Sequence, residues 1–294
     1  MGQSKFAVLF LIFAAALLGL TYPLIANTMH KHDPYHFVAL RFMIASAIML
    51  PYFLRYATKE LLLVGGTLGL LNCASYLTQT FGLQMITASR AAFLMGTYVI
   101  FIAILAPIFR IQSLTKRDVF CALFCTLGIY ILTGCDTSQL TMGDGWTIIC
   151  AIIIAVTIMY VCQVSKRNYD PVLLVSTQII ATGIFSLCSC LVFSDLHFEG
   201  LQNLSFWLPL IYCSIFATIF TFFLQIKYQK YLSVQKVALI WCMEPVFASF
   251  FDWMINGTHL NLYTLLGGSI ILLSIILQLQ QSPKESVINE QNRL

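Results

Sequence analysis

One carboxylate in this sequence lies deep inside an apolar stretch. Glu244 comes about twelve residues into the stretch Leu232–Ile255, so a helical rise of 1.5 Å per residue places it ~18 Å along, near the centre of a bilayer core of about 30 Å. A charge there costs about 2.5–3.5 kcal/mol on insertion scales, so we expect the side chain to face the interior of a helix bundle. It could carry a coupling proton or bind a cationic substrate group. Alternatively, it hydrogen-bonds backbone groups freed by Pro245 and holds a kink.

A polar stripe occurs in the apolar stretch Leu61–Leu83. Asn72, Tyr76 and Gln79 are spaced i, i+4 and i+7, which puts them on one face of a helix. Such a face inside a membrane protein is expected to line a cavity, although aromatic residues there can equally serve packing. The other polar and aromatic residues that we predict to bind substrate at middle depth are Tyr22, Tyr98, Tyr160, Gln225, Trp241 and Glu244.

Three basic residues enter apolar stretches near their ends. Arg41 and Arg90 do so from one side of the membrane and Lys236 from the other. Each side chain can either snorkel to the lipid headgroups or contact a substrate. We include Arg90 among the predicted substrate-binding residues.

Motifs for cofactor, metal or catalytic chemistry are missing from the sequence. There is no Walker A motif, dinucleotide-binding glycine loop or nucleophile elbow. The five histidines show no ligand spacing, and the cysteines lie mostly within apolar runs, where they act as small packing residues. No basic block with interleaved aromatic residues is present, so we expect no cofactor, no metal and no nucleic-acid partner.

The amino-acid composition indicates what kind of secondary structure positions these residues. The 294 residues are 59% hydrophobic and only 10% charged, which excludes an ordinary soluble enzyme and indicates an integral membrane protein of many helices. We predict an all-α membrane protein of ten transmembrane helices, at Phe6–Met29, Tyr35–Leu54, Leu61–Leu83, Ile86–Phe109, Asp118–Thr133, Gly145–Ser165, Val172–Phe193, Phe206–Ile226, Leu232–Ile255 and Leu262–Leu279.

Basic residues are unevenly distributed between these stretches. With the amino terminus inside the cell, thirteen Lys and Arg residues fall in inside segments and three in outside segments, namely Lys31, Arg41 and Arg90. The positive-inside rule therefore predicts a multi-pass protein of the cell (inner or plasma) membrane with both termini in the cytoplasm.

The two halves of the sequence show a weak internal repeat. Asp33-Pro34 matches Asp170-Pro171 at an offset of 137 residues. Beyond a longer loop the offset becomes 146, and the matched pairs include Gln79 with Gln225, Arg90 with Lys236, and Tyr98 with Glu244. Five helices per half is an odd number, so the halves must cross the membrane in opposite senses, which is an architecture of secondary transporters.

These features resemble the ten-helix EamA-type branch of the drug/metabolite transporter superfamily over roughly Phe6 to Gln280. The motifs that carry the resemblance are Gly19-Leu20-Thr21-Tyr22-Pro23, Arg41-Phe42, Ser89-Arg90-Ala91-Ala92-Phe93-Leu94 and Ala238-Leu239-Ile240-Trp241-Cys242-Met243-Glu244-Pro245-Val246-Phe247-Ala248. The resemblance implies transport of small metabolites, often export of amino acids or related compounds, without ATP.

The sequence therefore predicts a secondary transporter that moves a small polar metabolite, an amino acid or related compound, by alternating access. Its partners would be this substrate, the lipid bilayer and, if Glu244 cycles a proton, a coupling proton. The alternatives are an exchanger or importer of a nucleoside-type or S-adenosyl metabolite, a channel, or a membrane-embedded enzyme, although we expect no enzymatic activity. We expect residues 1–137 to form the first five-helix repeat, 138–281 the second and 282–294 a polar cytoplasmic tail.

Overall fold

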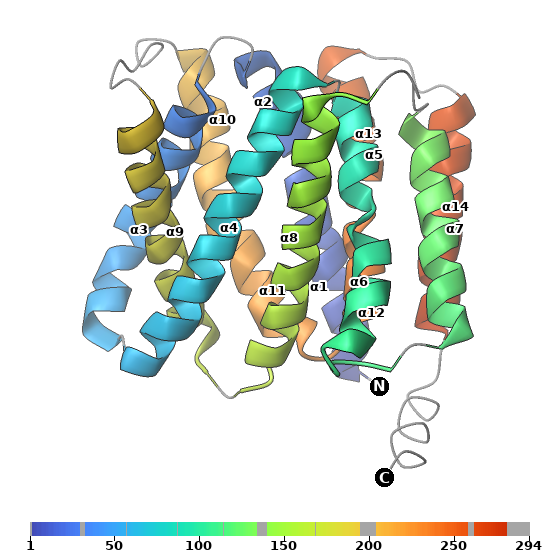
Figure 1. Cartoon of the computed structure of the whole chain (residues 1–294), viewed down its shortest axis with the longest axis horizontal. Helices are drawn as coiled ribbons and strands as arrows, with labels where there is room; N and C mark the ends of the chain where they lie inside the picture. The colour runs from blue at the N-terminus through green and yellow to red at the C-terminus, as the bar shows by residue number, and fades with distance from the viewer. Residues whose placement is uncertain are drawn as a thin grey trace.

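The structure is a computed structural model that describes residues 2–29, 33–56, 58–86, 88–113, 115–133, 140–167, 169–194, 204–257 and 262–280. These residues form a bundle of roughly parallel and antiparallel helices (Figure 1), and no strand occurs among them. The helices are α1 (Gly2–Gly19), α2 (Thr21–Met29), α3 (Pro34–Tyr56), α4 (Lys59–Met85), α5 (Ala88–Gly96), α6 (Tyr98–Ile108), α7 (Lys116–Thr133), α8 (Met142–Val164), α9 (Pro171–Phe193), α10 (Leu204–Ser214), the π-helix η1 (Ile215–Phe220), α11 (Thr221–Gln229), α12 (Val234–Trp241), α13 (Glu244–Asn256) and α14 (Leu262–Leu279).

In the part of the chain that the structure describes, nine helical segments are long and apolar enough to cross a membrane. They are Gln3–Ile25, Pro34–Tyr56, Lys59–Met85, Arg90–Ile108, Met142–Val164, Pro171–Phe193, Phe206–Gln229, Val234–Asn256 and Leu262–Leu279. Each corresponds to one of the ten predicted stretches. The remaining prediction, Asp118–Thr133, corresponds to α7, which has 18 residues and begins with Lys116, Arg117 and Asp118. The predicted tail, 282–294, lies outside the described residues.

The outer faces of the helices carry large apolar side chains. Leu63, Val192 and Phe193 are about 70% exposed, and many other Leu, Ile and Phe side chains are more than 40% exposed. So much exposed apolar surface is stable only against lipid. The protein is therefore a multi-pass membrane protein.

Three of the membrane-crossing segments are interrupted, where the sequence predicted continuous helices. The breaks separate α1 from α2, α5 from α6, and α12 from α13. Pro23 and Pro245 each lack the N–H that would bond the carbonyl four residues earlier, which weakens the helix at Gly19 and Trp241. At the break between α5 and α6 the Thr97 hydroxyl donates to the Leu94 carbonyl at 2.5 Å.

When the two halves are aligned at the sequence offset of 146 residues, the break between α5 and α6 coincides with the break between α12 and α13. That offset pairs Tyr98 with Glu244, and these are the first residues of α6 and α13 respectively. It also pairs the short helix before one break, α5, with the short helix before the other, α12. Equivalent residues therefore begin the second half of each broken helix.

Small residues allow several helices to approach closely, as is typical of membrane proteins. At Gly65 in α4, a Cβ atom would clash with the side chain and backbone of Thr177 in α9. At the next residue, Gly66, a Cβ atom would meet nothing within 4 Å. The pair offers a matched test of this packing.

We expect Gly65→Ala to lower the apparent melting temperature of the purified protein and Gly66→Ala to leave it unchanged or raise it. Forcing a methyl group into a packed contact costs about 1–3 kcal/mol, whereas replacing a helical glycine that has open space beside it by alanine gains up to about 1 kcal/mol. Thermal unfolding of both variants in detergent measures the difference. Equal melting temperatures would contradict the close packing of α4 on α9.

Candidate functional site

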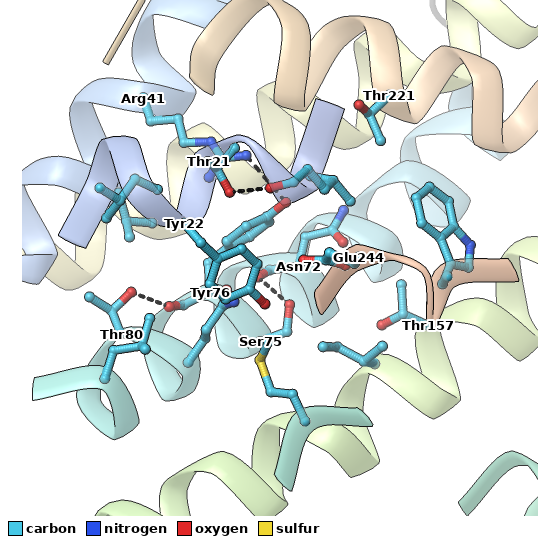
Figure 2. A pocket seen from close by; sticks show the side chains of 18 of the residues that line it. Thr21, Tyr22, Arg41, Asn72, Ser75, Tyr76, Thr80, Thr157, Thr221 and Glu244 are labelled. Atoms are coloured by element: carbon cyan, nitrogen blue, oxygen red, sulfur yellow. Dashed lines mark hydrogen bonds between the residues drawn. The ribbon is translucent and has the colours of Figure 1, made fainter. Parts of the chain in front are cut away.

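A cavity of about 700 Å³ lies inside the bundle. Its wall is built from α2, α3, α4, α8 and α11 together with the breaks at Tyr98 and at Trp241–Glu244. Figure 2 shows labelled side chains from these separate elements gathered around one space. The structure brings eight of the ten predicted substrate-binding residues to this wall, namely Tyr22, Asn72, Tyr76, Gln79, Tyr98, Gln225, Trp241 and Glu244.

Glu244 lies at the middle of its membrane segment, Val234–Asn256, and begins the half-helix α13. The amino-terminal end of a helix carries a partial positive charge, which favours a carboxylate there. The Tyr22 hydroxyl lies against the carboxylate, and the Arg41 guanidinium is within electrostatic reach of it. Among the described residues Glu244 forms no ion pair, so the carboxylate faces the cavity without a fixed counter-ion.

Tyr98 links the two broken helices that share a register. Its hydroxyl donates to the Ala238 carbonyl of α12 at 3.4 Å, and the Cys242 thiol contacts the same hydroxyl at 3.5 Å. The ring is 6% exposed and lines the cavity. The starts of α6 and α13 are thus tied together directly beside Glu244.

The polar stripe of α4 faces the cavity, as its spacing predicted. Asn72, Tyr76 and Gln79 all line the wall. The neighbouring hydroxyl groups of Ser75 and Thr80 also line it, but they donate to carbonyls of their own helix at 2.9 and 2.6 Å. The groups of α4 that remain available to a ligand are therefore chiefly those of the stripe.

Arg41 is the charged residue of the described cavity wall that the sequence-based site left out. Its side chain is only 4% exposed, so it does not snorkel to the membrane surface. The guanidinium instead extends inward, where Nε donates to Thr218 Oγ1 at 2.8 Å and Nη2 donates to the Ala217 carbonyl at 3.2 Å. Both acceptors belong to the π-helix at the middle of the segment Phe206–Gln229.

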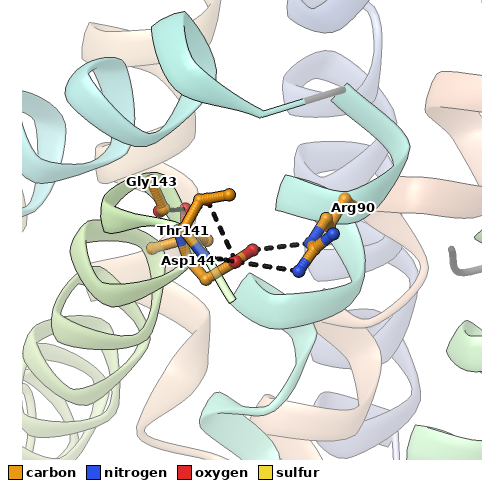
Figure 3. Close-up of polar contacts among 5 residues, drawn as sticks. Arg90, Thr141, Gly143 and Asp144 are labelled. Atoms are coloured by element: carbon orange, nitrogen blue, oxygen red, sulfur yellow. Dashed lines mark hydrogen bonds and ion pairs between the residues drawn. The ribbon is translucent and has the colours of Figure 1, made fainter. Parts of the chain in front are cut away.

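Arg90 and Tyr160 are not among the residues that line the cavity. Arg90 Nε and Nη2 donate to the two carboxylate oxygens of Asp144 at 2.6 and 2.8 Å (Figure 3). Asp144 also accepts from the backbone N–H of Thr141 at 2.7 Å and so caps the start of α8. Tyr160 packs against an apolar cluster that joins α3, α4 and α9.

The Arg90–Asp144 pair joins α5 to α8 in a nearly dry environment, because the two side chains are 13% and 2% exposed. Removing one partner of such a pair leaves an uncompensated charge, at a cost of about 3–5 kcal/mol. We therefore expect Arg90→Gln to lower the unfolding free energy strongly. The double variant with Asp144→Asn should lose less than the sum of the single variants, as measured by a double-mutant cycle of unfolding in detergent. Strict additivity would contradict a direct energetic link.

The cavity opens at one end of the bundle, where the exposed Gln84 lines its wall. Its wall extends to Gln84 and Ile86, at the end of α4. The opposite end, where α1 begins and α14 ends (Figure 1), is filled by a buried apolar cluster that includes Leu11, Val99 and Val237. None of the described wall residues comes from α1 before Leu18 or from α12 before Trp241.

Known proteins match this chain along nearly its whole length. A model of the EamA-like transporter family matches twice, at residues 5–134 and 141–280. A protein of Archaeoglobus fulgidus named an uncharacterized transporter is 29% identical over 272 residues, which cover 92% of this chain and 85% of that protein. A solved crystal structure of a protein given no further name is similar in fold, with a TM-score of 0.74 at 17% identity, over 94% of this chain and 99% of that one.

The two family matches together cover most of the 294 residues, and they include all three broken helices and the residues that line the cavity. The chain therefore belongs to the EamA-like transporter family, within the drug/metabolite transporter superfamily.

Proposed function

We propose that this protein is a secondary transporter that carries a small polar metabolite, an amino acid or related compound, across the cell membrane by alternating access. The observation that carries the proposal is the cavity itself. It lies at middle depth, is open at one end where Gln84 is exposed, has a buried apolar cluster toward the other end, and holds both a carboxylate, Glu244, and a guanidinium, Arg41. A volume of about 700 Å³ suits a metabolite and its water.

We further propose ten membrane-spanning helices arranged as two inverted repeats, residues 1–137 and 138–281. The double match of the family model supports the division, and the common register of the breaks at Tyr98 and Glu244 supports the repeat. Counting α7 as a span is supported by its packing against α14. There, a Cβ atom at Gly267 would clash with Leu132 and Gly128.

The proposed orientation has both termini in the cytoplasm, with the open end of the cavity facing outward. It rests on the distribution of Lys and Arg between the spans. On a cysteine-free background, an impermeant thiol reagent added to intact cells should modify Leu140→Cys and not Lys166→Cys. The reverse pattern would overturn the orientation.

A nucleoside-type or S-adenosyl metabolite is the second candidate substrate class. The six aromatic side chains on the wall favour it because a planar base stacks well on such rings; they are Tyr22, Phe37, Tyr76, Tyr98, Phe222 and Trp241. The two classes share a need for polar contacts at middle depth. They differ in whether an aromatic ring system is required for binding.

Counterflow in proteoliposomes tests the proposal. Purified full-length protein is reconstituted with unlabelled amino acids, adenosine or S-adenosyl-L-methionine inside, and uptake of the matching labelled compound is followed. A carrier gives transient, saturable accumulation of at least one compound above protein-free liposomes. An ion current that does not saturate would identify a channel instead, and chemical turnover without flux would identify an enzyme.

A further inference from the structure

No carboxylate of a described residue lies within ion-pair distance of Arg41, although the Glu244 carboxylate in the same cavity is within electrostatic reach. The Arg41 side chain is 4% exposed, and its hydrogen bonds go to the Thr218 hydroxyl, the Ala217 carbonyl and the Tyr76 hydroxyl, all of them neutral. In the described part of the chain the ion pair is Arg90 with Asp144, which leaves Arg41 outside any such pair. A cation at this depth costs about 2.5–3.5 kcal/mol on insertion scales, which marks it as a functional group.

The π-helix η1 provides two of the hydrogen-bond acceptors that hold this guanidinium. The Thr218 hydroxyl donates to the Cys213 carbonyl at 2.8 Å, so its oxygen is free to accept from Arg41 Nε. The Tyr76 ring lies under the guanidinium, 4.6 Å from its central carbon. Widened π-turns are frequently found at functional sites. These contacts hold the guanidinium in one orientation at the cavity wall.

The same contacts leave part of the guanidinium unused. Arginine has five N–H donors, and the bonds to described residues employ only Nε and Nη2. Nη1 therefore has no partner among the described residues, and Arg41 lines the cavity. An N–H group of Nη1 that is left free in this way can donate a charge-assisted hydrogen bond to a carboxylate oxygen.

Two fully buried polar atoms on the wall that have no hydrogen-bond partner among the described residues are donors. They are Asn72 Nδ2 and Trp241 Nε1, and these residues are 6% and 5% exposed. An indole N–H can only donate. A buried donor without a partner costs about 1–3 kcal/mol, which a ligand rich in acceptor oxygens would recover.

We propose that Arg41 is the anion-binding residue of the substrate site, and that the transported compound carries a carboxylate which binds to Arg41. This inference rests on the proposed transport function and adds a requirement to it. Compounds that are purely cationic, or that lack the acid group, bind weakly. Arg41 thereby determines specificity, and Glu244 remains available for a proton or for a second group of the substrate.

Probe pairs that differ only in the carboxylate test the requirement. L-Tryptophan is compared with tryptamine, L-leucine with isoamylamine, and S-adenosyl-L-homocysteine with 5′-S-(3-aminopropyl)-5′-thioadenosine, each as a competitor of counterflow and in thermal-shift titration. We expect the wild-type protein to favour the acid member of the pair it recognises by about 10-fold or more. In Arg41→Gln the two members should bind within about 3-fold of each other, because the preference comes from the guanidinium.

Two further variants separate this role from folding. Arg55→Gln alters an exposed arginine at the far end of the same helix, α3, and should keep the preference for the acid. Thr218→Val keeps Arg41 but removes the acceptor of Nε, and should weaken the preference. If Arg41→Gln does not fold, the wild-type comparison of the probe pairs still decides.

The outcomes distinguish the two proposals. Saturable transport in which the amine or thioadenosine competes as well as the acid would overturn the role of Arg41 while leaving the transport function in place. An undiminished preference for the acid in folded Arg41→Gln would do the same. The absence of counterflow for every probe would overturn both proposals.

Discussion

Glu244→Gln should exchange substrate across a liposome membrane at close to the wild-type rate and fail to accumulate it when a pH gradient is imposed. Glutamine preserves the size and most of the hydrogen-bonding capacity of the side chain beside Tyr22, but it cannot take up and release a proton. Exchange requires no net movement of protons, whereas accumulation does. The measurement is uptake of the labelled substrate identified by counterflow, with and without the gradient.

Asp252→Asn is the matched control, because Asp252 lies two turns further along the same half-helix, α13, and is not among the described cavity residues. It should retain accumulation. Full accumulation in Glu244→Gln would contradict a coupling role and leave the carboxylate with a structural one. Loss of both exchange and binding, with the fold intact, would instead assign Glu244 to direct contact with a cationic group of the substrate.

Hydropathy located the membrane segments well, because the lipid requires about twenty apolar residues wherever a helix crosses. The interruptions were not predicted. Pro23 and Pro245 indicated weak points, but the break at Thr97 has no proline, and there the Thr97 hydroxyl bonds the Leu94 carbonyl. Whether a helix bends or breaks at such a point is decided by the packing of neighbouring helices, which hydropathy does not report.

The gathering of eight predicted residues at one cavity follows from a simple constraint. Polar side chains at middle depth avoid lipid, so residues such as Gln79 and Gln225 tend to face the same interior space. Arg90 does not line the cavity, because it donates its hydrogen bonds to Asp144, which is 54 positions away in the chain. No local pattern at Arg90 identifies that partner.

For Arg41, the sequence could not predict that the side chain faces the cavity. Its distance from the end of its own helix allowed either snorkelling or inward binding, since a long side chain reaches both ways. The deciding partners are Ala217 and Thr218, more than 170 residues away, in a π-turn that the sequence did not predict. Depth along one helix is therefore a poor guide to the role of a long basic side chain.

Access to the cavity from one face should make transport sensitive to modification near its open end. Gln84 is exposed and lines the wall at the end of α4, next to the start of α8, where a Cβ atom at Gly143 would meet Met85. On a cysteine-free background we expect Gln84→Cys to react with a bulky, impermeant thiol reagent from the outside and to lose most of its counterflow activity. A group of that size blocks substrate entry and prevents the open end from closing.

Leu140→Cys is the control for this experiment, because Leu140 is 87% exposed just before the same end of α8 and is not among the described wall residues. It should be modified equally well without loss of transport. Saturating substrate should slow the modification of Gln84→Cys and leave that of Leu140→Cys unchanged, since only the former lies on the substrate's path. If Gln84→Cys is modified and transport continues at the wild-type rate, the cavity is not the route of the substrate, and the transport path must lie elsewhere in the bundle.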